Sequence, residues 1–229
     1  MIPLRDENPS RSTPVVTRLL IVANVLAFGY QLSLGRQVVA FLIDWGMVPV
    51  RLTVGLEQGG EALVEAGLPL LTSMFLHGGV LHLLGNMWYL WIFGDNVEDR
   101  IGKLGFLVFY LVAGVAAGLI HVAFNPASEV PAVGASGAIA GVLGAYLVAF
   151  PRARVIMLLP LGLLWQLVAW PAVFALGLWF VFQFFSGAFS LFVAGRGGGG
   201  IAWWAHIGGF AFGGLAMLLL GGARRRRPE

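Results

Sequence analysis

Two side chains that could act as a nucleophile and its base lie in apolar stretches of this sequence. Ser136 stands in the tetrapeptide Gly134-Ala135-Ser136-Gly137, at the start of an apolar run, and His206 stands at the start of another run 70 residues later. Polar groups are costly inside a bilayer and are usually kept there for a function. A serine and a histidine that meet inside a membrane could carry out nucleophilic catalysis.

The residues around Ser136 allow two interpretations. The flanking glycines let other backbone approach the serine closely, and a helix start offers free N–H groups and positive potential to an oxyanion. A serine at a helix start is also a common N-cap, and the tetrapeptide by itself favours that structural interpretation. His206 by itself fits either a base or a histidine bonded to a backbone carbonyl.

Small residues predict that the two segments pack closely together. They are spaced four apart: Gly137, Gly141 and Ala145 in the segment of Ser136, and Gly209 and Gly213 in the segment of His206. Stripes of this kind let helix backbones approach closely within membranes. Because each stripe begins beside its polar residue, the packing would place Ser136 next to His206.

A second polar group comprises His77, His82 and Asn86. His82 and Asn86 are four residues apart and therefore share one helix face. Their side chains can donate hydrogen bonds, so together with the Ser136 backbone N–H they could stabilise an oxyanion. We expect His77 to pin a loop to this helix. A metal site is disfavoured, since zinc sites add a carboxylate or cysteine to histidine or use three close histidines, and no acidic residue lies near these positions.

The composition places these residues in a membrane protein. Of the 229 residues, 59% are hydrophobic and 11% are charged, against about 25% charged in soluble domains. The absence of cysteine excludes disulfides and thiolate metal sites. The net charge of +3 does not indicate a nucleic-acid partner, because the charges lie at the ends of apolar runs.

Six apolar segments are candidates for helices that cross a bilayer. They lie at 14–34, 79–93, 104–124, 136–150, 163–185 and 202–220. The pattern predicts an all-α protein with a cytoplasmic tail at 1–13, a six-helix membrane domain at 14–222 and a basic cytoplasmic tail at 223–229. Eleven Lys and Arg residues then lie on the side of both tails and three on the other side, which indicates cytoplasmic termini in a multi-pass protein of the cell membrane.

Three segments between or within the predicted spans have special features. The loop 35–76, on the outer side, is long enough to have a structure or a function of its own, and it could hold short helices that lie at the membrane interface. The glycine-rich segment 195–200 fits a mobile cover or a plain linker. The fourth span has 15 residues and a length of about 22 Å, less than a bilayer core of about 30 Å, so Ser136 should lie below the outer surface in a cavity that admits water.

Taken together, these residues resemble the rhomboid family of intramembrane serine proteases. The resemblance rests on His77, His82 and Asn86 in the second span, Gly-Ala-Ser-Gly at the head of the fourth, and Ala205-His206-x-Gly208-Gly209 in the sixth. It implies a six-helix bundle in which Ser136 is the nucleophile and His206 the general base, without an aspartate. It also implies that His82, Asn86 and the Ser136 amide hold the oxyanion.

The resemblance further implies that the substrates are transmembrane segments of membrane proteins and that no cofactor is needed. The segment before His206 would cap the site, and the fifth span would help to admit the substrate. Two features depart from the family pattern. The loop 35–76 has no Trp-Arg pair, and Ala140 stands where many members have a tyrosine that stacks on the base. Phe210 or an aromatic residue of the fifth span could orient His206 instead.

Two other functions are compatible with parts of the pattern. An inactive relative could bind membrane helices, although such relatives usually lose the serine or the histidine, and both are present here. A transporter or channel could line a polar path with His82, Asn86 and His206, but the sequence shows neither the internal repeats nor the intramembrane carboxylates typical of transporters. The sequence does not indicate an oligomeric state.

Overall fold

Long helices make up the body of the protein. The computed structural model describes residues 2–161, 164–193 and 202–221. Within them, six helices have 14 residues or more: α1 (Val15–Ser33), α6 (Val80–Ile101), α7 (Lys103–Phe124), α8 (Ser136–Ala149), α9 (Ala172–Val193) and α10 (Trp203–Leu219). Short helices lie between α1 and α6: α2 (Val38–Trp45), α3 (Pro49–Gln58), α4 (Gly60–Gly67) and α5 (Pro69–Thr72), with single 3-10 turns at Gly35–Gln37 and Ser73–Phe75.

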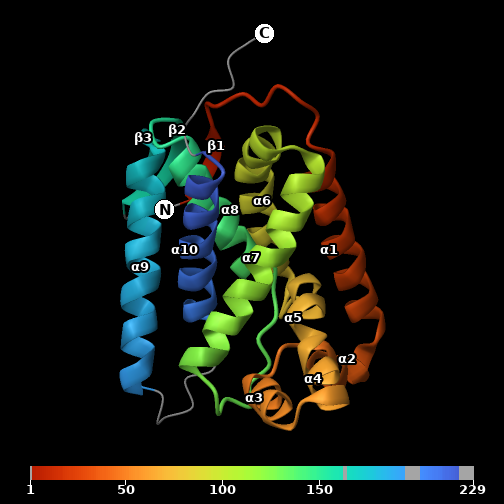
Figure 1. The fold of residues 1–229 in the computed structure, drawn as a ribbon. Coiled ribbons are helices and arrows are strands. Elements are labelled where there is room, and N and C mark those ends of the chain that lie inside the picture. Colours follow the sequence, from red (N-terminus) through yellow and green to blue (C-terminus); the bar gives the residue numbers. More distant parts are fainter. Residues whose placement is uncertain (1, 162–163, 194–201, 222–229) are drawn as a thin grey trace.

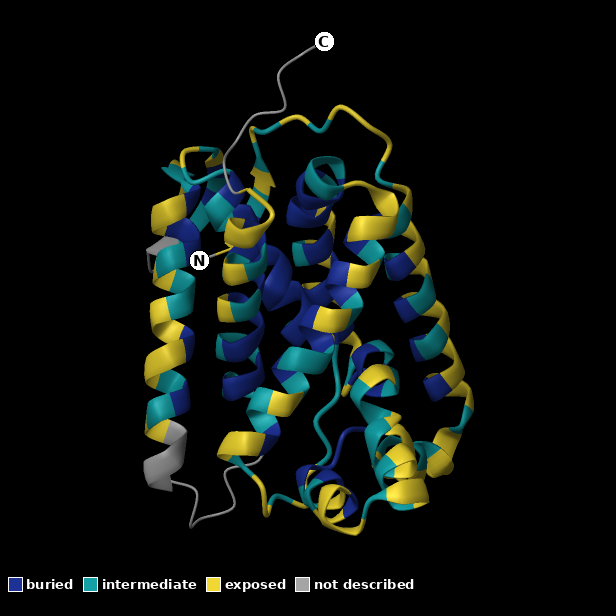
Figure 2. Cartoon of the chain, viewed as in Figure 1, coloured by how far each residue is buried: buried dark blue, intermediate teal, exposed yellow. Residues whose placement is uncertain are grey.

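Helix α8 occupies the centre of the bundle and packs against α6, α7, α9 and α10, whereas α1 packs on the outside against α6 and α7. Its residues from Gly137 to Tyr146 are all buried, and Figure 2 shows the buried positions gathered in the middle of the molecule. The outward faces of the peripheral helices are apolar but exposed, as at Leu26 of α1 (68%) and Phe185 of α9 (67%). A protein that buries small residues inside and exposes large apolar ones outside is suited to a lipid environment.

Length and composition identify this protein as a multi-pass membrane protein. Among the described residues, α1, α7 and α9 are long and apolar enough to span a membrane. Helix α6 qualifies together with the preceding segment Gly60–Phe75, to which it is bent by 80°, whereas α8 and α10 are apolar but shorter. By length and composition, the described residues therefore contain three candidate spans, or four if α6 and the segment before it form one bent span, whereas six were expected.

The expectation of an all-α protein is wrong, because a three-stranded antiparallel sheet covers one end of the bundle. Its strands are β1 (Ile2–Asp6), β2 (Arg154–Leu161) and β3 (Leu164–Pro171), in the order β1-β2-β3. Figure 1 shows the sheet at the end opposite to α3 and α4. Part of the predicted N-terminal tail is therefore a strand packed on the membrane domain.

The sheet also corrects the predicted start of the fifth span, which is Ala172 and not residue 163. Residues 164–171 are apolar like a spanning helix, and a short apolar run cannot be assigned to a strand or a helix by periodicity alone. Here the segment is a strand because β3 pairs with β2, with Arg154 opposite Pro171 and Leu161 opposite Leu164. The segment 151–160, which connects the predicted fourth and fifth spans, is mostly strand β2 for the same reason.

Helix α6 is longer than predicted, extending to Ile101 in place of residue 93. The charged residues that follow position 93 form its last turns, and the chain reverses at Gly102, whose φ of +80° favours glycine. The Glu98 carboxylate is buried and accepts hydrogen bonds from Val16 N at 3.0 Å and from Thr17 N and Oγ1 at 2.8 Å. Glu98 thus satisfies free N–H groups at the start of α1.

The loop 35–76 folds into short helices as expected, and it supports the chain that leads into α8. Met47 and Ala132 exchange backbone hydrogen bonds of 3.1 and 2.8 Å, and Gly134 N donates to Ser73 O at 2.9 Å. These bonds fix the backbone that leads into Ser136. The predicted cover at 195–200 and the basic tail at 223–229 lie outside the described residues.

Candidate active site

The side chains of Ser136 and His206 are in direct contact at the centre of the site. Ser136 Oγ lies 2.8 Å from His206 Nε2, a hydrogen-bonding distance between α8 and α10. Ser136 is the first residue of α8, whose N-cap is Ala135, and no side chain caps this helix. The serine hydroxyl is therefore bonded to the histidine and does not cap the helix.

Glycines at the α8–α10 interface explain how the two side chains come within reach. A Cβ atom on Gly209 would collide with the Gly137 carbonyl oxygen, and one on Gly213 would collide with that of Gly141. The backbones of α8 and α10 are thus in contact, as the small-residue stripes predicted. The stripe on α8 also meets α7, because a Cβ atom on Gly137 would lie 2.8 Å from Ala117 Cβ.

The second ring nitrogen of His206 has a partner on α9 that the sequence reasoning missed. His206 Nδ1 lies 2.8 Å from Oε1 of Gln183, a buried side chain. The ring is flanked by Trp179, at a centroid distance of 6.2 Å, and by Trp203, at 6.3 Å. A glutamine alone in an apolar helix is itself a signal of function in a membrane, and it could have been singled out.

Ala140 stands at the position where many rhomboids have an aromatic ring, and its methyl group does not orient His206. Ala140 is fully buried in α8. The ring that lies beside the histidine comes from α9 instead, as Trp179, and this is one of the alternatives expected from the sequence. Phe210, the other candidate, packs on Trp179 and stacks on Phe180 with centroids 4.7 Å apart.

His82 and Asn86 lie against the backbone just before Ser136. A Cβ atom on Gly134 would be 2.8 Å from His82 Nε2 and 3.5 Å from Asn86 Nδ2, and the φ of Gly134 is +127°. Only glycine allows both the close approach and this backbone conformation. Gly78 N donates to His82 Nδ1 at 3.4 Å, which leaves the ring proton on Nε2, the atom that faces Gly134.

His77 holds Asn86 from behind and fastens the loop to α1. Its Nε2 lies 3.0 Å from Asn86 Nδ2, so the amide can donate one hydrogen to His77 and keep the other free. The His77 backbone N–H and C=O are both bonded to the Gln31 side chain, at 3.0 and 2.9 Å. His77 therefore connects α1, the loop and the asparagine.

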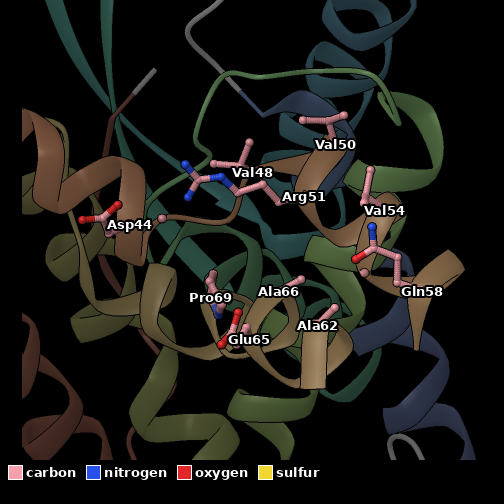
Figure 3. A pocket seen from close by; sticks show the side chains of 12 residues that line it. Asp44, Val48, Val50, Arg51, Val54, Gln58, Ala62, Glu65, Ala66 and Pro69 are labelled. Atoms are coloured by element: carbon pink, nitrogen blue, oxygen red, sulfur yellow. The ribbon is translucent and has the colours of Figure 1, made fainter. Parts of the chain in front are cut away.

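Two pockets lie near these elements, and they differ in their relation to the site. One, of about 520 Å³, is formed by the outer-loop helices (Figure 3) and contains Asp44, Arg51 and Glu65 but none of the residues around Ser136. The other, of about 430 Å³, lies between α6 and α9, is also lined by Pro3 of β1 and Met157 of β2, and is mostly apolar. Trp179 and Gln183 line it, so this second pocket reaches the side chains that contact His206. Among the described residues, no cluster of three or more His, Asp or Glu could hold a metal.

Comparison with known proteins finds the same family over most of the chain. The Rhomboid domain matches residues 65–223. Presenilin-associated rhomboid-like protein A, mitochondrial, of Danio rerio is 31% identical over 154 residues, 62% of this chain and 40% of the relative. Rhomboid protease GluP of Bacillus subtilis (strain 168) is 45% identical over 78 residues, 34% of this chain and 15% of the relative. The human presenilin-associated rhomboid-like protein, mitochondrial, is 35% identical over 96 residues, 41% of this chain and 25% of the relative. The matched part thus covers 15–40% of the length of these relatives.

Proposed function

Because this chain belongs to the rhomboid family, we propose that it is an intramembrane serine endopeptidase that cleaves transmembrane segments of other membrane proteins. The observation that carries the proposal is the contact of 2.8 Å between Ser136 Oγ and His206 Nε2 inside a membrane-embedded bundle. An unprotonated Nε2 at this distance can take the serine proton as the hydroxyl attacks a carbonyl. The protonated ring then donates the proton to the leaving amine, and water hydrolyses the acyl-enzyme.

The negative charge of the tetrahedral intermediate needs hydrogen-bond donors, which we assign to His82 Nε2–H, Asn86 Nδ2–H and the Ser136 backbone N–H. Support comes from the close approach of both side chains to Gly134, two residues before the nucleophile. The start of α8 adds free N–H groups and a positive potential. Donors fixed before the reaction stabilise the transition state without reorganisation.

The substrate helix must leave the lipid and unwind before a carbonyl can reach Ser136. We propose that it approaches between α6 and α9, where the apolar pocket of about 430 Å³ extends to Trp179 and Gln183. Intrahelical hydrogen bonds shield the carbonyls of an intact helix. Substrates are therefore expected to contain small or helix-breaking residues near the outer face.

We further propose that all six long helices cross the cell membrane, with both termini in the cytoplasm. The charge distribution supports this arrangement, with eleven Lys and Arg residues on the side of the termini and three on the other. The short helices α3 and α4 and the three-stranded sheet lie at opposite ends of the bundle, as the proposal requires (Figure 1). A protease-sensitive tag after residue 229 should resist digestion in intact cells and be cut in inverted vesicles.

The proposed chemistry is tested by labelling with a fluorophosphonate probe and by cleavage of a reporter transmembrane protein in liposomes. The wild-type protein should react with both, and Ser136→Ala and His206→Ala should each lose activity by about 10⁴-fold or more. Ser128→Ala is a matched control, because this serine lies in the loop before α8 and caps only the local backbone at Val130 N. Full activity in either dyad variant would refute the assignment, and transport that survives Ser136→Ala would favour a transporter.

A further inference from the structure

The contact between α9 and the histidine points to a residue that orients the base. We propose that Gln183 is a positioning residue for His206 and takes the place that an aspartate holds in a serine protease triad. The inference rests on the proposed function. Gln183 would hold the histidine in a protein whose residue 140 is an alanine, with only a methyl group.

The two hydrogen bonds of the His206 ring determine each other. If Ser136 donates its hydroxyl proton to Nε2, then Nε2 carries no hydrogen and Nδ1 must carry it. Nδ1–H then donates to Gln183 Oε1 at 2.8 Å. The amide oxygen therefore selects the tautomer in which Nε2 is the acceptor, which is the tautomer a general base needs.

The surroundings of Gln183 make this bond specific. The side chain is 7% exposed, and rings of Trp179 and Trp203 flank the histidine at 34° and 84° to its plane. These contacts limit the rotation of the ring, and the hydrogen bond from Nδ1 to Gln183 fixes the angle at which Nε2 faces Ser136. A neutral amide accepts the hydrogen bond without the desolvation cost that a carboxylate would bring to an apolar helix.

The helix that orients the base also borders the proposed path of the substrate. Trp179 and Gln183 lie one turn apart on α9, contact His206 and line the pocket between α6 and α9. A shift of α9 would therefore lengthen the bond to His206 Nδ1. The reactivity of the serine is expected to depend on the position of α9 for this reason.

Variants at position 183 test the inference through the rate and its pH dependence. Gln183→Met keeps the length of the side chain but removes the acceptor, and should lower kcat by about 10- to 100-fold with KM unchanged, since one hydrogen bond to a ring that becomes charged is lost. Gln183→Glu keeps an acceptor, so kcat should return to within about threefold of wild type. The acidic limb of its pH–rate profile should move to higher pH by about one unit or more, because a carboxylate stabilises the charged ring.

The pH profile is interpretable because few titratable groups act on the histidine. Among the described residues, those with an electrostatic effect on His206 are His82 from α6 and His121 from α7. Both are unchanged in the position 183 variants. A purely structural role of Gln183 would alter the yield or thermal stability of the variants but would leave the pH profile in place.

Controls separate this inference from the proposed function. Phe185→Met changes an exposed position on α9, which is 67% accessible, and should cleave and label like wild type. If wild type neither cleaves nor labels, the proposed function fails. If wild type labels and Gln183→Met reacts at the same rate, or if Gln183→Glu has the wild-type pH profile, only the positioning role is refuted. Should Gln183→Met not accumulate, the pH profile of Gln183→Glu decides alone.

Discussion

Replacement of Gly213 by alanine is expected to push α10 away from α8, whereas the same change at the next residue should be harmless. A Cβ atom on Gly213 would lie 2.7 Å from Gly141 Cα and closer still to the Gly141 carbonyl oxygen. On Gly214 the nearest atoms, Gly144 O and Val148 Cγ2, would be 3.7 Å away, an ordinary van der Waals distance. The two variants therefore add the same methyl group to the same helix and differ only in what it meets.

The expected loss of stability is estimated from the difference in unfolding free energy between the two variants. The gain in helix propensity from glycine to alanine, up to about 1 kcal/mol, is common to both and cancels. Overpacking of a close interface costs about 1–3 kcal/mol, so Gly213→Ala should be less stable than Gly214→Ala by that amount. For a chain of this size each kcal/mol corresponds to about 2–4 °C in Tm, which gives an expected gap of about 2–12 °C.

The displacement of α10 should also disturb the contact between Ser136 and His206. Gly213 lies seven residues after His206, or about 10 Å along α10, so a shift of the helix by about 1 Å carries the imidazole with it. The bond of 2.8 Å from Ser136 Oγ would then exceed hydrogen-bonding range. Misplacement on this scale can cost about 10²-fold in rate, and we expect probe labelling to fall by about 10- to 100-fold.

The assay is thermal unfolding of both variants in the same detergent, followed by the rate of fluorophosphonate labelling. Gly214→Ala should label at the wild-type rate, with a Tm equal to that of wild type or higher by up to about 4 °C from the gain in helix propensity. Equal Tm values and equal labelling rates for the two variants would show that the backbones of α8 and α10 are not in contact at Gly213. A lower Tm with unchanged labelling would show that the contact is real but does not position the dyad.

Three further predictions concern other contacts. Asn86→Ala removes one proposed oxyanion donor and should lower kcat by about 10²- to 10³-fold with little change in KM, as measured by reporter cleavage. Glu98→Gln cannot accept all three bonds from the start of α1, including both from Thr17, and should destabilise the protein by about 1–3 kcal/mol in thermal unfolding, whereas an unchanged Tm would contradict the capping role. Burial, together with the nearby charge of Asp95, raises the pKa of the Asp6 carboxyl from 3.8 to about 6. Between these two pKa values the folded state binds more protons than the unfolded state. Stability should therefore fall as the pH rises from about 4 to 6, by about 1–2 kcal/mol because solvent screens this partly exposed carboxyl, and Asp6→Asn should flatten this part of the curve.

The positions of the spanning helices were predictable where the apolar run and the helix coincide. The predicted segments at 14–34, 104–124 and 136–150 agree with α1, α7 and α8 to within one residue at each end. The errors occur where a different interaction overrides hydropathy. Strand β3 is apolar but pairs with β2, and the charged end of α6 stays helical because Glu98 binds the start of α1.

The sequence by itself determined which chemical groups this protein carries and which helix faces can approach closely. The types and spacing of Ser136, His206, His82 and Asn86, with the small residues beside them, are local properties that can be read along the chain. Only the tertiary structure decided which groups touch: that α9 brings Gln183 to His206 Nδ1, and that Gly134 lies against His82 and Asn86. The physical reason is that these contacts depend on the relative rotation and depth of neighbouring helices, which are set by backbone contacts between distant glycines and by the sheet at one end of the bundle.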